Sequence, residues 1–316
     1  MRLIDRYIAF LFANKLLFSG IAILMVVFYH CPWGNSIMKL LSYPGFLGVD
    51  IFFLFTGFGL CYSIQKNSIS EFYKRRLIRI VPMFFVLAII TTLLLGDYSW
   101  SSWLCNLSTL SYYGIGGRRI DWYLSSLFAF YLLFPLFYKS LCVCRNRGGY
   151  LLVLQIVMIA LLSALNLDWN YECALGRLGI YITGISCFLD EKNKAYKKAM
   201  IIYLLLLPAV LVLYMGGYLH TYMIMYFLAP FVIVGICVIF YMANKEGRIV
   251  KLVNFVGGVT LEIYVANCIC MKLQSTFEVL NGVSLYWVLN LLIVPMVIIL
   301  NKYANRAIEA HINFRK

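Results

Sequence analysis

Two polar side chains that could move a proton lie in apolar segments near the start of the chain. His30 ends one apolar run, Asp50 begins the next, and a short segment with two prolines and two glycines joins the runs. An ionisable group inside an apolar run costs about 2.5–3.5 kcal/mol on membrane-insertion scales, so each is a functional candidate. A carboxylate that accepts the proton of one ring nitrogen leaves the other nitrogen as a general base for a hydroxyl group. A structural pair that only neutralises two costly groups is the alternative.

Basic residues at the start of a later apolar run have the chemistry of an anion site. Arg76 and Arg79 are three residues apart, so their side chains share one face of a helix. Two guanidinium groups side by side match the geometry of phosphate oxygens. Basic residues at the cytoplasmic end of a membrane span are also what topology requires, and this second explanation stays open.

Four further residues are candidates for substrate binding or for structural pairing. Glu262 lies inside an apolar run and Arg177 at the end of another, so each is expected to pair with an opposite charge or to contact substrate. Trp122 and Ser125 begin an aromatic-rich run, which is typical both of helix packing and of a substrate wall. The ten cysteines include no C-x-x-C pair, so we expect small buried hydrophobic residues and no metal site.

The elements that carry these residues are predicted to be transmembrane helices. Of the 316 residues, 63% are apolar and 13% are charged, whereas globular domains have about 25% charged residues. Such a composition excludes a water-soluble protein and supplies roughly ten spans of about 20 residues. We predict an all-α, polytopic bundle that forms a single transmembrane domain over residues 1–316, with no appended soluble domain.

Apolar runs between polar breaks give ten predicted spans. They are Leu16–Cys31, Phe46–Ile64, Ile80–Leu95, Trp122–Val143, Tyr150–Leu165, Leu175–Leu189, Ala199–Met215, Tyr222–Met242, Phe255–Cys270 and Leu285–Leu300. The amphipathic stretch Tyr7–Asn14 is expected to extend the short first span.

The positive charges orient the predicted bundle. Lys and Arg near span ends are retained in the cytoplasm, and with both termini cytoplasmic 22 of the 27 fall on that side. The five on the outer side are Lys39, Arg118, Arg119, Arg177 and Lys272. The net charge of +14 is thus explained by topology. Because the cations punctuate apolar runs and do not form one solvated face, no nucleic-acid partner is predicted.

Six segments, in order, resemble the acyltransferase-3 family of bacterial inner-membrane O-acyltransferases, and the resemblance runs from residue 15 to about residue 300. The segments are Ser19–His30, Gly48–Gly57, Phe72–Pro82, Trp122–Pro135, Arg177–Gly184 and Thr260–Asn267. Three positions depart from the family pattern. Ser19 stands where the family has an arginine, Thr56 replaces a serine, and Asn267 stands where relatives often have histidine.

The resemblance implies a reaction and a role for each candidate residue. Family members transfer an acyl group, commonly acetyl, from a cytoplasmic coenzyme A thioester to a hydroxyl of a sugar or another envelope acceptor. The expected catalytic residues are His30 and Asp50, the expected acetyl-CoA-binding residues are Arg76, Arg79, Lys15 and Ser19, and the expected acceptor-binding residues are Trp122, Ser125, Arg177 and Glu262. Lys15, one helical turn before Ser19, would replace the missing arginine.

The resemblance also implies partners and a location. We expect a multi-pass protein of the bacterial inner membrane, in contact with lipid, that uses acyl-CoA as co-substrate without a metal. The expected acceptor is a cell-surface or lipid-linked glycan, such as an exopolysaccharide. Polysaccharide-biosynthesis proteins or a second copy of the chain are possible partners. Two other functions stay open: a transporter or flippase whose buried charges line a path, and an acyltransferase-like partner that has lost catalysis.

Overall fold

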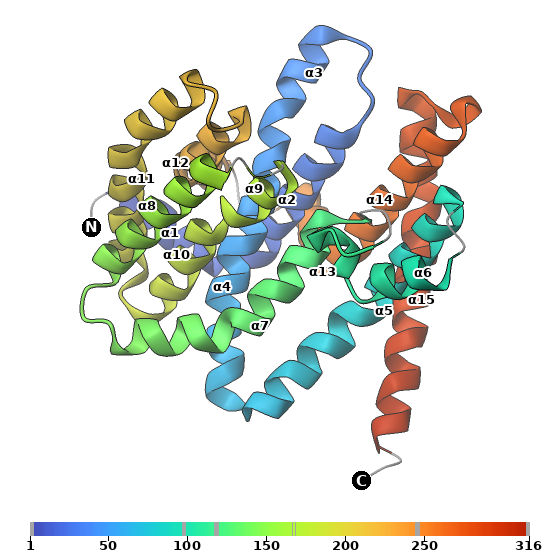
Figure 1. Cartoon of the computed structure of the whole chain (residues 1–316), viewed down its shortest axis with the longest axis horizontal. Helices are drawn as coiled ribbons and strands as arrows, with labels where there is room; N and C mark the ends of the chain where they lie inside the picture. The colour runs from blue at the N-terminus through green and yellow to red at the C-terminus, as the bar shows by residue number, and fades with distance from the viewer. Residues whose placement is uncertain are drawn as a thin grey trace. The chain divides into compact units, whose positions relative to one another are not determined.

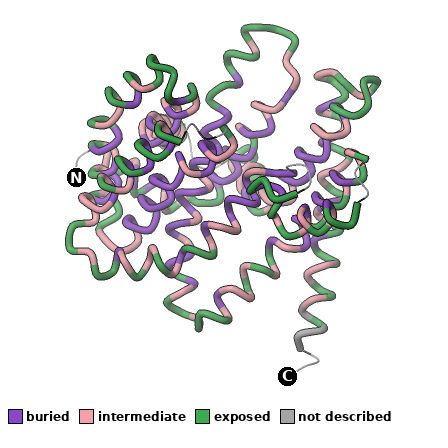
Figure 2. Tube along the Cα trace, viewed as in Figure 1, coloured by how far each residue is buried: buried purple, intermediate pink, exposed green. Residues whose placement is uncertain are grey.

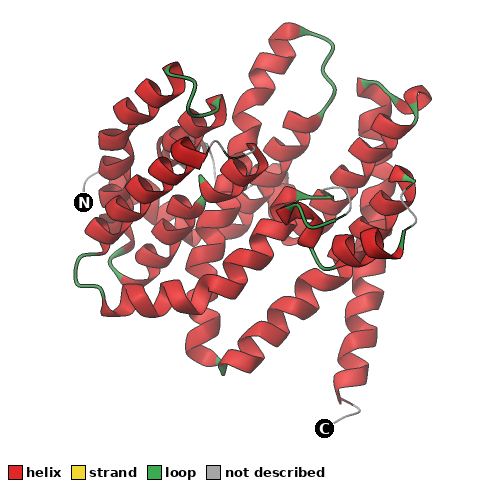
Figure 3. Ribbon diagram, in the orientation of Figure 1, coloured by secondary structure: helices red, strands yellow, loops and turns green. Residues whose placement is uncertain are grey.

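The computed structural model describes residues 3–96, 99–116, 120–165, 167, 169–243 and 247–313, and every regular element in these ranges is a helix (Figure 3). For residues 309 and 311–313 it describes the backbone alone. The predicted all-α class is confirmed. Six cations used above to orient the chain lie outside the described residues: Arg2, Arg118, Arg119, Lys245, Arg315 and Lys316.

The helices are labelled in chain order (Figure 1). The α-helices are α1 (Leu3–Ala13), α2 (Lys15–His30), α3 (Ser36–Ser42), α4 (Gly48–Lys66), α5 (Ile69–Leu95), α6 (Trp100–Leu107), α7 (Trp122–Val143), α8 (Arg147–Leu165), α9 (Trp169–Leu175), α10 (Leu178–Leu189), α11 (Lys192–Met215), α12 (Thr221–Met242), α13 (Arg248–Gly258), α14 (Thr260–Thr276) and α15 (Val283–Asn313). The short 3-10 helices are η1 (Tyr43–Leu47), η2 (Leu110–Tyr113) and η3 (Glu278–Leu280).

Most of these helices have the length and composition of membrane spans. Among the described residues eight qualify, or up to ten if each of two bent helix pairs is one span, in agreement with the ten predicted. α15 has only 17% of its most apolar window buried inside the protein, and Leu291 and Met296 are 73% and 67% exposed. Exposed apolar surface of this extent suits lipid and not water. The chain is therefore a multi-pass membrane protein.

The two bent pairs correct the outlines of the first and ninth predicted spans. α1 and α2 bend by 84° at Asn14, so Tyr7–Asn14 does not continue α2 as one straight helix. The Asn14 side-chain amide donates to the Phe10 carbonyl oxygen at 2.9 Å, and such local bonds compete with a continuous helix. α13 and α14 bend by 76°, after two glycines that weaken the end of α13. Glu262 consequently lies in the first turn of α14 and not within a straight ninth span.

The chain divides into two compact units. Unit 1 comprises Met1–Ala22, Leu47–Asn67 and Phe130–Phe255. Unit 2 comprises Ile23–Phe46, Ser68–Ala129 and Val256–Lys316. Of the two predicted catalytic residues, Asp50 belongs to unit 1 and His30 to unit 2.

The core of unit 1 is the pair of helices α4 and α10. Ten of the twelve residues of α10 are buried, and Figure 2 shows both helices mainly in the colour of buried residues. A Cβ atom added to Gly57 would lie 2.2 Å from the Tyr181 carbonyl oxygen, and one added to Gly184 would lie 2.1 Å from the Leu54 carbonyl oxygen. The two backbones thus touch at these glycines, as small residues allow in membrane helix pairs. α8 and α11 pack against α10, and α12 packs against α4.

The central helix of unit 2 is α14, which packs against both α5 and α15. α5 begins at the N-cap Ser68, whose Oγ accepts a hydrogen bond from the Glu71 N–H at 3.2 Å. It ends at Gly96, whose φ of 67° is the left-handed conformation that glycine adopts at helix ends. α5 therefore begins well before the predicted span at Ile80, and it carries Arg76 and Arg79 on one helix.

Candidate active site

Asp50 and Arg177 form a buried ion pair in unit 1. Arg177 Nε lies 3.3 Å from Asp50 Oδ2, and the two side chains are 1% exposed or less. Arg177 Nη1 also donates to the Cys173 carbonyl oxygen at 2.9 Å. The Tyr226 ring centroid lies 4.5 Å from the guanidinium carbon, within the range of a cation–π contact. From the sequence, Arg177 is expected to bind the acceptor and Asp50 to pair with His30. In the structure these two residues pair with each other.

The register of α4 against α10 places this ion pair. Asp50 precedes Gly57 by seven residues, and Arg177 precedes Gly184 by the same number. Seven residues make about two turns of a helix. Two parallel helices that touch at the glycines therefore meet again two turns earlier, at Asp50 and Arg177.

Among the described residues, one carboxylate oxygen of Asp50 has no hydrogen-bond partner. Oδ2 faces Arg177, whereas Oδ1 is buried and accepts no hydrogen bond from the described residues. A buried acceptor without a donor is costly. Oδ1 is therefore the atom of Asp50 that is available to a proton donor, and the predicted pairing of Asp50 with His30 stays a prediction.

His30 belongs to a chain of side-chain contacts within unit 2. Its Nδ1 lies 3.1 Å from Nδ2 of Asn267 on α14. The Asn267 Oδ1 atom contacts the hydroxyl of Tyr286 on α15, and that hydroxyl lies 2.6 Å from the Val27 carbonyl oxygen of α2. Three helices thus hold the imidazole in place. Asn267 appeared in the sequence only as a departure from the family pattern, and Tyr286 was not singled out.

Two carboxylates make hydrogen bonds at α14: Asp121, which precedes α7, and Glu262, in the first turn of α14. Tyr264 donates its hydroxyl proton to Asp121 Oδ1 at 2.5 Å, and Asp121 Oδ2 accepts the Leu124 N–H at 2.6 Å at the start of α7. Glu262 Oε1 accepts a hydrogen bond from the Asn301 amide of α15 at 2.5 Å. The partner of Glu262 in the described structure is thus a neutral amide and not the cation that the sequence analysis considered.

Trp122 and Ser125 begin α7 in unit 2. Ser125 is buried, and its carbonyl oxygen accepts a hydrogen bond from the Tyr113 hydroxyl at 3.3 Å. The Trp122 ring meets the Tyr123 ring edge-on, with centroids 5.9 Å apart. These contacts are local to the start of α7, and the acceptor-binding role of the two residues stays a prediction.

The arginines expected to bind the donor differ in their surroundings. The guanidinium carbon of Arg76 lies 5.8 Å from the Phe72 ring centroid, while Arg79 is exposed. Immediately before Arg76 in the sequence, Arg75 pairs at 3.0 Å with Glu71, which lies four residues earlier on the same helix. Arg75 is therefore engaged by a carboxylate, and Arg79 presents its side chain to the surroundings of α5.

Lys15 and Ser19 lie one turn apart on α2, in unit 1. The Lys15 ammonium lies 6.0 Å from the Phe55 ring centroid, and Ser19 is buried. The Lys192 ammonium lies 5.4 Å from the Phe58 ring centroid, so a second cation reaches the aromatic side chains of α4. Sequence reasoning counted Lys192 only among the charges that orient the bundle.

A carboxylate–imidazole pair that the sequence analysis missed also lies in unit 1. Glu172 Oε1 accepts the His220 backbone N–H at 3.1 Å, and Oε2 lies 2.7 Å from the His220 Nδ1. Glu172 is buried and His220 is half exposed. The pair fixes the beginning of α12 to α9.

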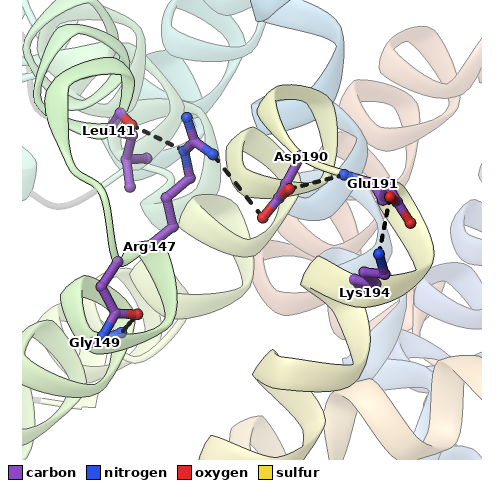
Figure 4. Close-up of polar contacts among 7 residues, drawn as sticks. Leu141, Arg147, Gly149, Asp190, Glu191 and Lys194 are labelled. Atoms are coloured by element: carbon purple, nitrogen blue, oxygen red, sulfur yellow. Dashed lines mark hydrogen bonds and ion pairs between the residues drawn. The ribbon is translucent and has the colours of Figure 1, made fainter.

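Other polar contacts of unit 1 lie at the connections between helices. Arg147 Nε donates to the Leu141 carbonyl oxygen at 2.9 Å, and its Nη1 lies 3.9 Å from Asp190 Oδ2 (Figure 4). Lys194 pairs with Glu191 at 2.9 Å. These contacts join the end of α7 to the turn between α10 and α11, and they form no site by themselves.

The ten cysteines are free, and seven of them are buried, whereas Cys142 is exposed. The expectation of buried cysteines is thus wrong for Cys142. Among the described residues no group of three His, Cys, Asp or Glu side chains has the geometry of a metal site.

Comparison with known proteins gives a match that includes the segments in which these contacts lie. A family model described as an acyltransferase domain matches residues 18–301, a range that includes His30, Asp50, Arg177 and Asn267. The chain belongs to the acyltransferase-3 family. Membership confirms the resemblance drawn from the six sequence segments.

A curated relative of this acyltransferase-3 chain is the acyltransferase MdmB of Streptomyces mycarofaciens, which is 31% identical over 115 residues. The aligned stretch covers 30% of the chain and 29% of the relative, so the chain spans less than a third of that protein's length. No solved structure matches the chain. The family is therefore established by the match over residues 18–301.

Proposed function

We propose that this acyltransferase-3 protein is a membrane O-acyltransferase that moves an acyl group, most simply acetyl, from cytoplasmic acyl-CoA to a hydroxyl of a cell-surface or lipid-linked glycan. Family membership and the membrane-spanning helices support acyl transfer at a membrane. The most direct support from the site is His30, whose Nδ1 lies 3.1 Å from the Asn267 amide. An imidazole held at one nitrogen can use the other as a base.

The proposed reaction needs only a base and the two substrates. The acceptor hydroxyl gives its proton to His30 as its oxygen attacks the thioester carbonyl. The new C–O bond forms, the C–S bond breaks, and the departing coenzyme A thiolate takes the proton back from the imidazolium. Asp50, whose Oδ1 has no partner among the described residues, is proposed to stabilise the imidazolium through its negative charge.

The proposed donor site uses the cations predicted from the sequence. Arg76 and Arg79 would bind coenzyme A phosphates on α5, and Lys15 would do so on α2. The exposed side chain of Arg79 supports its assignment. Lys192 joins the proposal because its ammonium reaches the ring of Phe58, about one turn of α4 after Phe55, the ring that the Lys15 ammonium reaches.

Replacing Arg79 with alanine is expected to weaken acyl-CoA binding roughly tenfold to a hundredfold, because a charge-assisted hydrogen bond is worth about 1.5–3 kcal/mol. Arg79→Lys should recover only part of the affinity, since a point charge does not replace the planar guanidinium. Acetyl-CoA binding to purified protein in nanodiscs measures the effect.

Arg75 provides the matched control for this prediction. Arg75→Ala removes the same charge from the same helix, but from a residue already paired with Glu71, so donor affinity should stay unchanged. If Arg76→Ala/Arg79→Ala protein inserts normally and binds acetyl-CoA as tightly as the wild type, the arginine pair serves membrane topology alone.

The proposed function is tested by thioester consumption. Purified protein in nanodiscs is given radiolabelled acetyl-CoA with and without a lipid-linked oligosaccharide, and both thiol release and label on the glycan are measured. We expect acceptor-dependent thiol release with the label on the glycan. Movement of the oligosaccharide across the membrane without thiol release would establish the flippase alternative. Acetyl-CoA binding without turnover would establish a protein that has lost catalysis.

A further inference from the structure

The Tyr286 hydroxyl faces two acceptors but has one proton. The Val27 carbonyl oxygen lies 2.6 Å away, and the second contact is to the atom placed as Asn267 Oδ1. Carbonyl oxygens of the backbone and of an amide only accept hydrogen bonds. One hydroxyl cannot donate to both, so one of the two contacts must run in the opposite direction.

Only the Asn267 contact can reverse. A backbone carbonyl has no proton to give, so Tyr286 must donate to Val27. The oxygen and nitrogen of an asparagine amide have nearly the same shape, and the hydrogen bonds around them decide which is which. With Nδ2 of Asn267 toward Tyr286, an amide N–H donates to the hydroxyl oxygen and all three groups are satisfied.

The same rotation of the amide by 180° decides which of its atoms faces His30 Nδ1, and the ring also has a hydrogen bond with the backbone of Val26. It places the amide oxygen of Asn267 toward His30 Nδ1, 3.1 Å from the amide atom at that position. Because the oxygen accepts, Nδ1 must carry the proton, and in a neutral imidazole Nε2 then has the free lone pair. We propose that Tyr286 and Asn267 are positioning residues that hold His30 as the Nδ1–H tautomer, with Nε2 as its basic nitrogen.

This arrangement serves both protonation states of His30. When Nε2 takes a proton, Nδ1–H continues to donate to the amide oxygen, so no neighbour has to move. With the opposite amide orientation, the imidazolium Nδ1–H would face an amide N–H, and two donors would meet. Asn267 and Tyr286 are fully buried, so water does not reach the amide to replace these bonds.

The inference rests on the proposed function for its catalytic meaning, but the tautomer can be measured without any turnover. The chain has three histidines, so nitrogen NMR of histidine-labelled protein in lipid is feasible, and His30→Gln identifies the His30 signals. We expect a protonated Nδ1 and an unprotonated Nε2 in the neutral ring. A protonated Nε2 would overturn the proposal. A protonated Nδ1 in protein that transfers no acyl group would leave the tautomer standing and reject the proposed function.

Kinetics of Asn267 variants supply the second test. Asn267→Leu should lower kcat roughly a hundredfold, within the contribution of about 10²–10⁴-fold from general-base catalysis. Asn267→Asp should keep most of the activity, because a carboxylate still accepts from Nδ1–H. It should also move the acidic limb of the rate profile to higher pH, since a neighbouring negative charge favours the imidazolium. Equal loss in Asn267→Asp and Asn267→Leu would mean that Asn267 donates to Nδ1, and the proposal would be wrong.

Tyr286→Phe removes the group that fixes the amide. We expect kcat to fall roughly five- to tenfold, in line with the loss of one hydrogen bond, with the KM for acetyl-CoA unchanged. Tyr196→Phe is the matched control, because it removes another buried tyrosine hydroxyl that donates to a backbone carbonyl, that of Pro230 at 3.0 Å. A kcat for Tyr286→Phe equal to that of the control would count against a positioning role.

Discussion

Alanine in place of His30 is expected to lower acyl transfer by about 10²–10⁴-fold, the range that general-base assistance contributes, while acetyl-CoA binding stays intact. The expectation follows from the reaction proposed above, in which no other described side chain takes the acceptor proton. Label transfer to a glycan acceptor and acetyl-CoA binding, measured on the same preparation, separate loss of catalysis from loss of donor affinity.

Two controls make this prediction decisive. All variants must reach the membrane in equal amounts, because a disturbed helix end would also lower activity. The double variant His30→Ala/Asp50→Asn should be little worse than His30→Ala if the two residues act in one step, since such residues are strongly non-additive. Wild-type transfer by well-expressed His30→Ala protein would rule out His30 as the base.

The membrane helices were predictable because lipid imposes one rule on every span. A segment that crosses the bilayer must be apolar over most of about 20 residues, and ten apolar runs of 15 to 22 residues indicate such segments whatever their neighbours are. Hydropathy contains no information on the direction of the helix axis, however. The bends at Asn14 and near Val259 were therefore missed, because each interrupts a run that is apolar on both sides.

The partner of Asp50 had a signal in the sequence that was not used. Asp50 and Gly57 have the same spacing as Arg177 and Gly184, and equal spacing from two contact glycines places the charges at one level. The two segments were recognised separately, each as a family motif. Proximity in sequence instead suggested His30 as the partner, since only a short loop separates the two spans.

The contacts of His30 had no comparable signal. Asn267 is 237 residues away from it, and Tyr286 is one of 24 tyrosines in an apolar helix with no pattern that sets it apart. Which side chains meet between α2, α14 and α15 depends on how far each helix is rotated and shifted. Periodicity predicts that a helix forms, but it does not fix this register.

Loss of one partner of the Asp50–Arg177 ion pair should strongly destabilise unit 1. Arg177→Met leaves a buried carboxylate without its cation, and breaking one partner of a buried pair costs about 3–5 kcal/mol. Arg75→Met is the matched control, because the exposed pair with Glu71 contributes only about 0–1 kcal/mol. Unfolding of the purified variants in detergent, followed by thermal or denaturant titration, measures the difference.

The double variant Asp50→Asn/Arg177→Met separates stability from catalysis. Removing both charges should recover most of the stability that Arg177→Met loses, because neutral replacement of a whole buried pair is often tolerated. A double variant less stable than Arg177→Met would contradict the ion-pair account. If Asp50 only balances Arg177, and Arg177 does not bind the acceptor, the recovered protein should transfer acyl groups at close to the wild-type rate. If its free Oδ1 also stabilises the His30 imidazolium, the protein should fold and bind acetyl-CoA but remain nearly as inactive as His30→Ala.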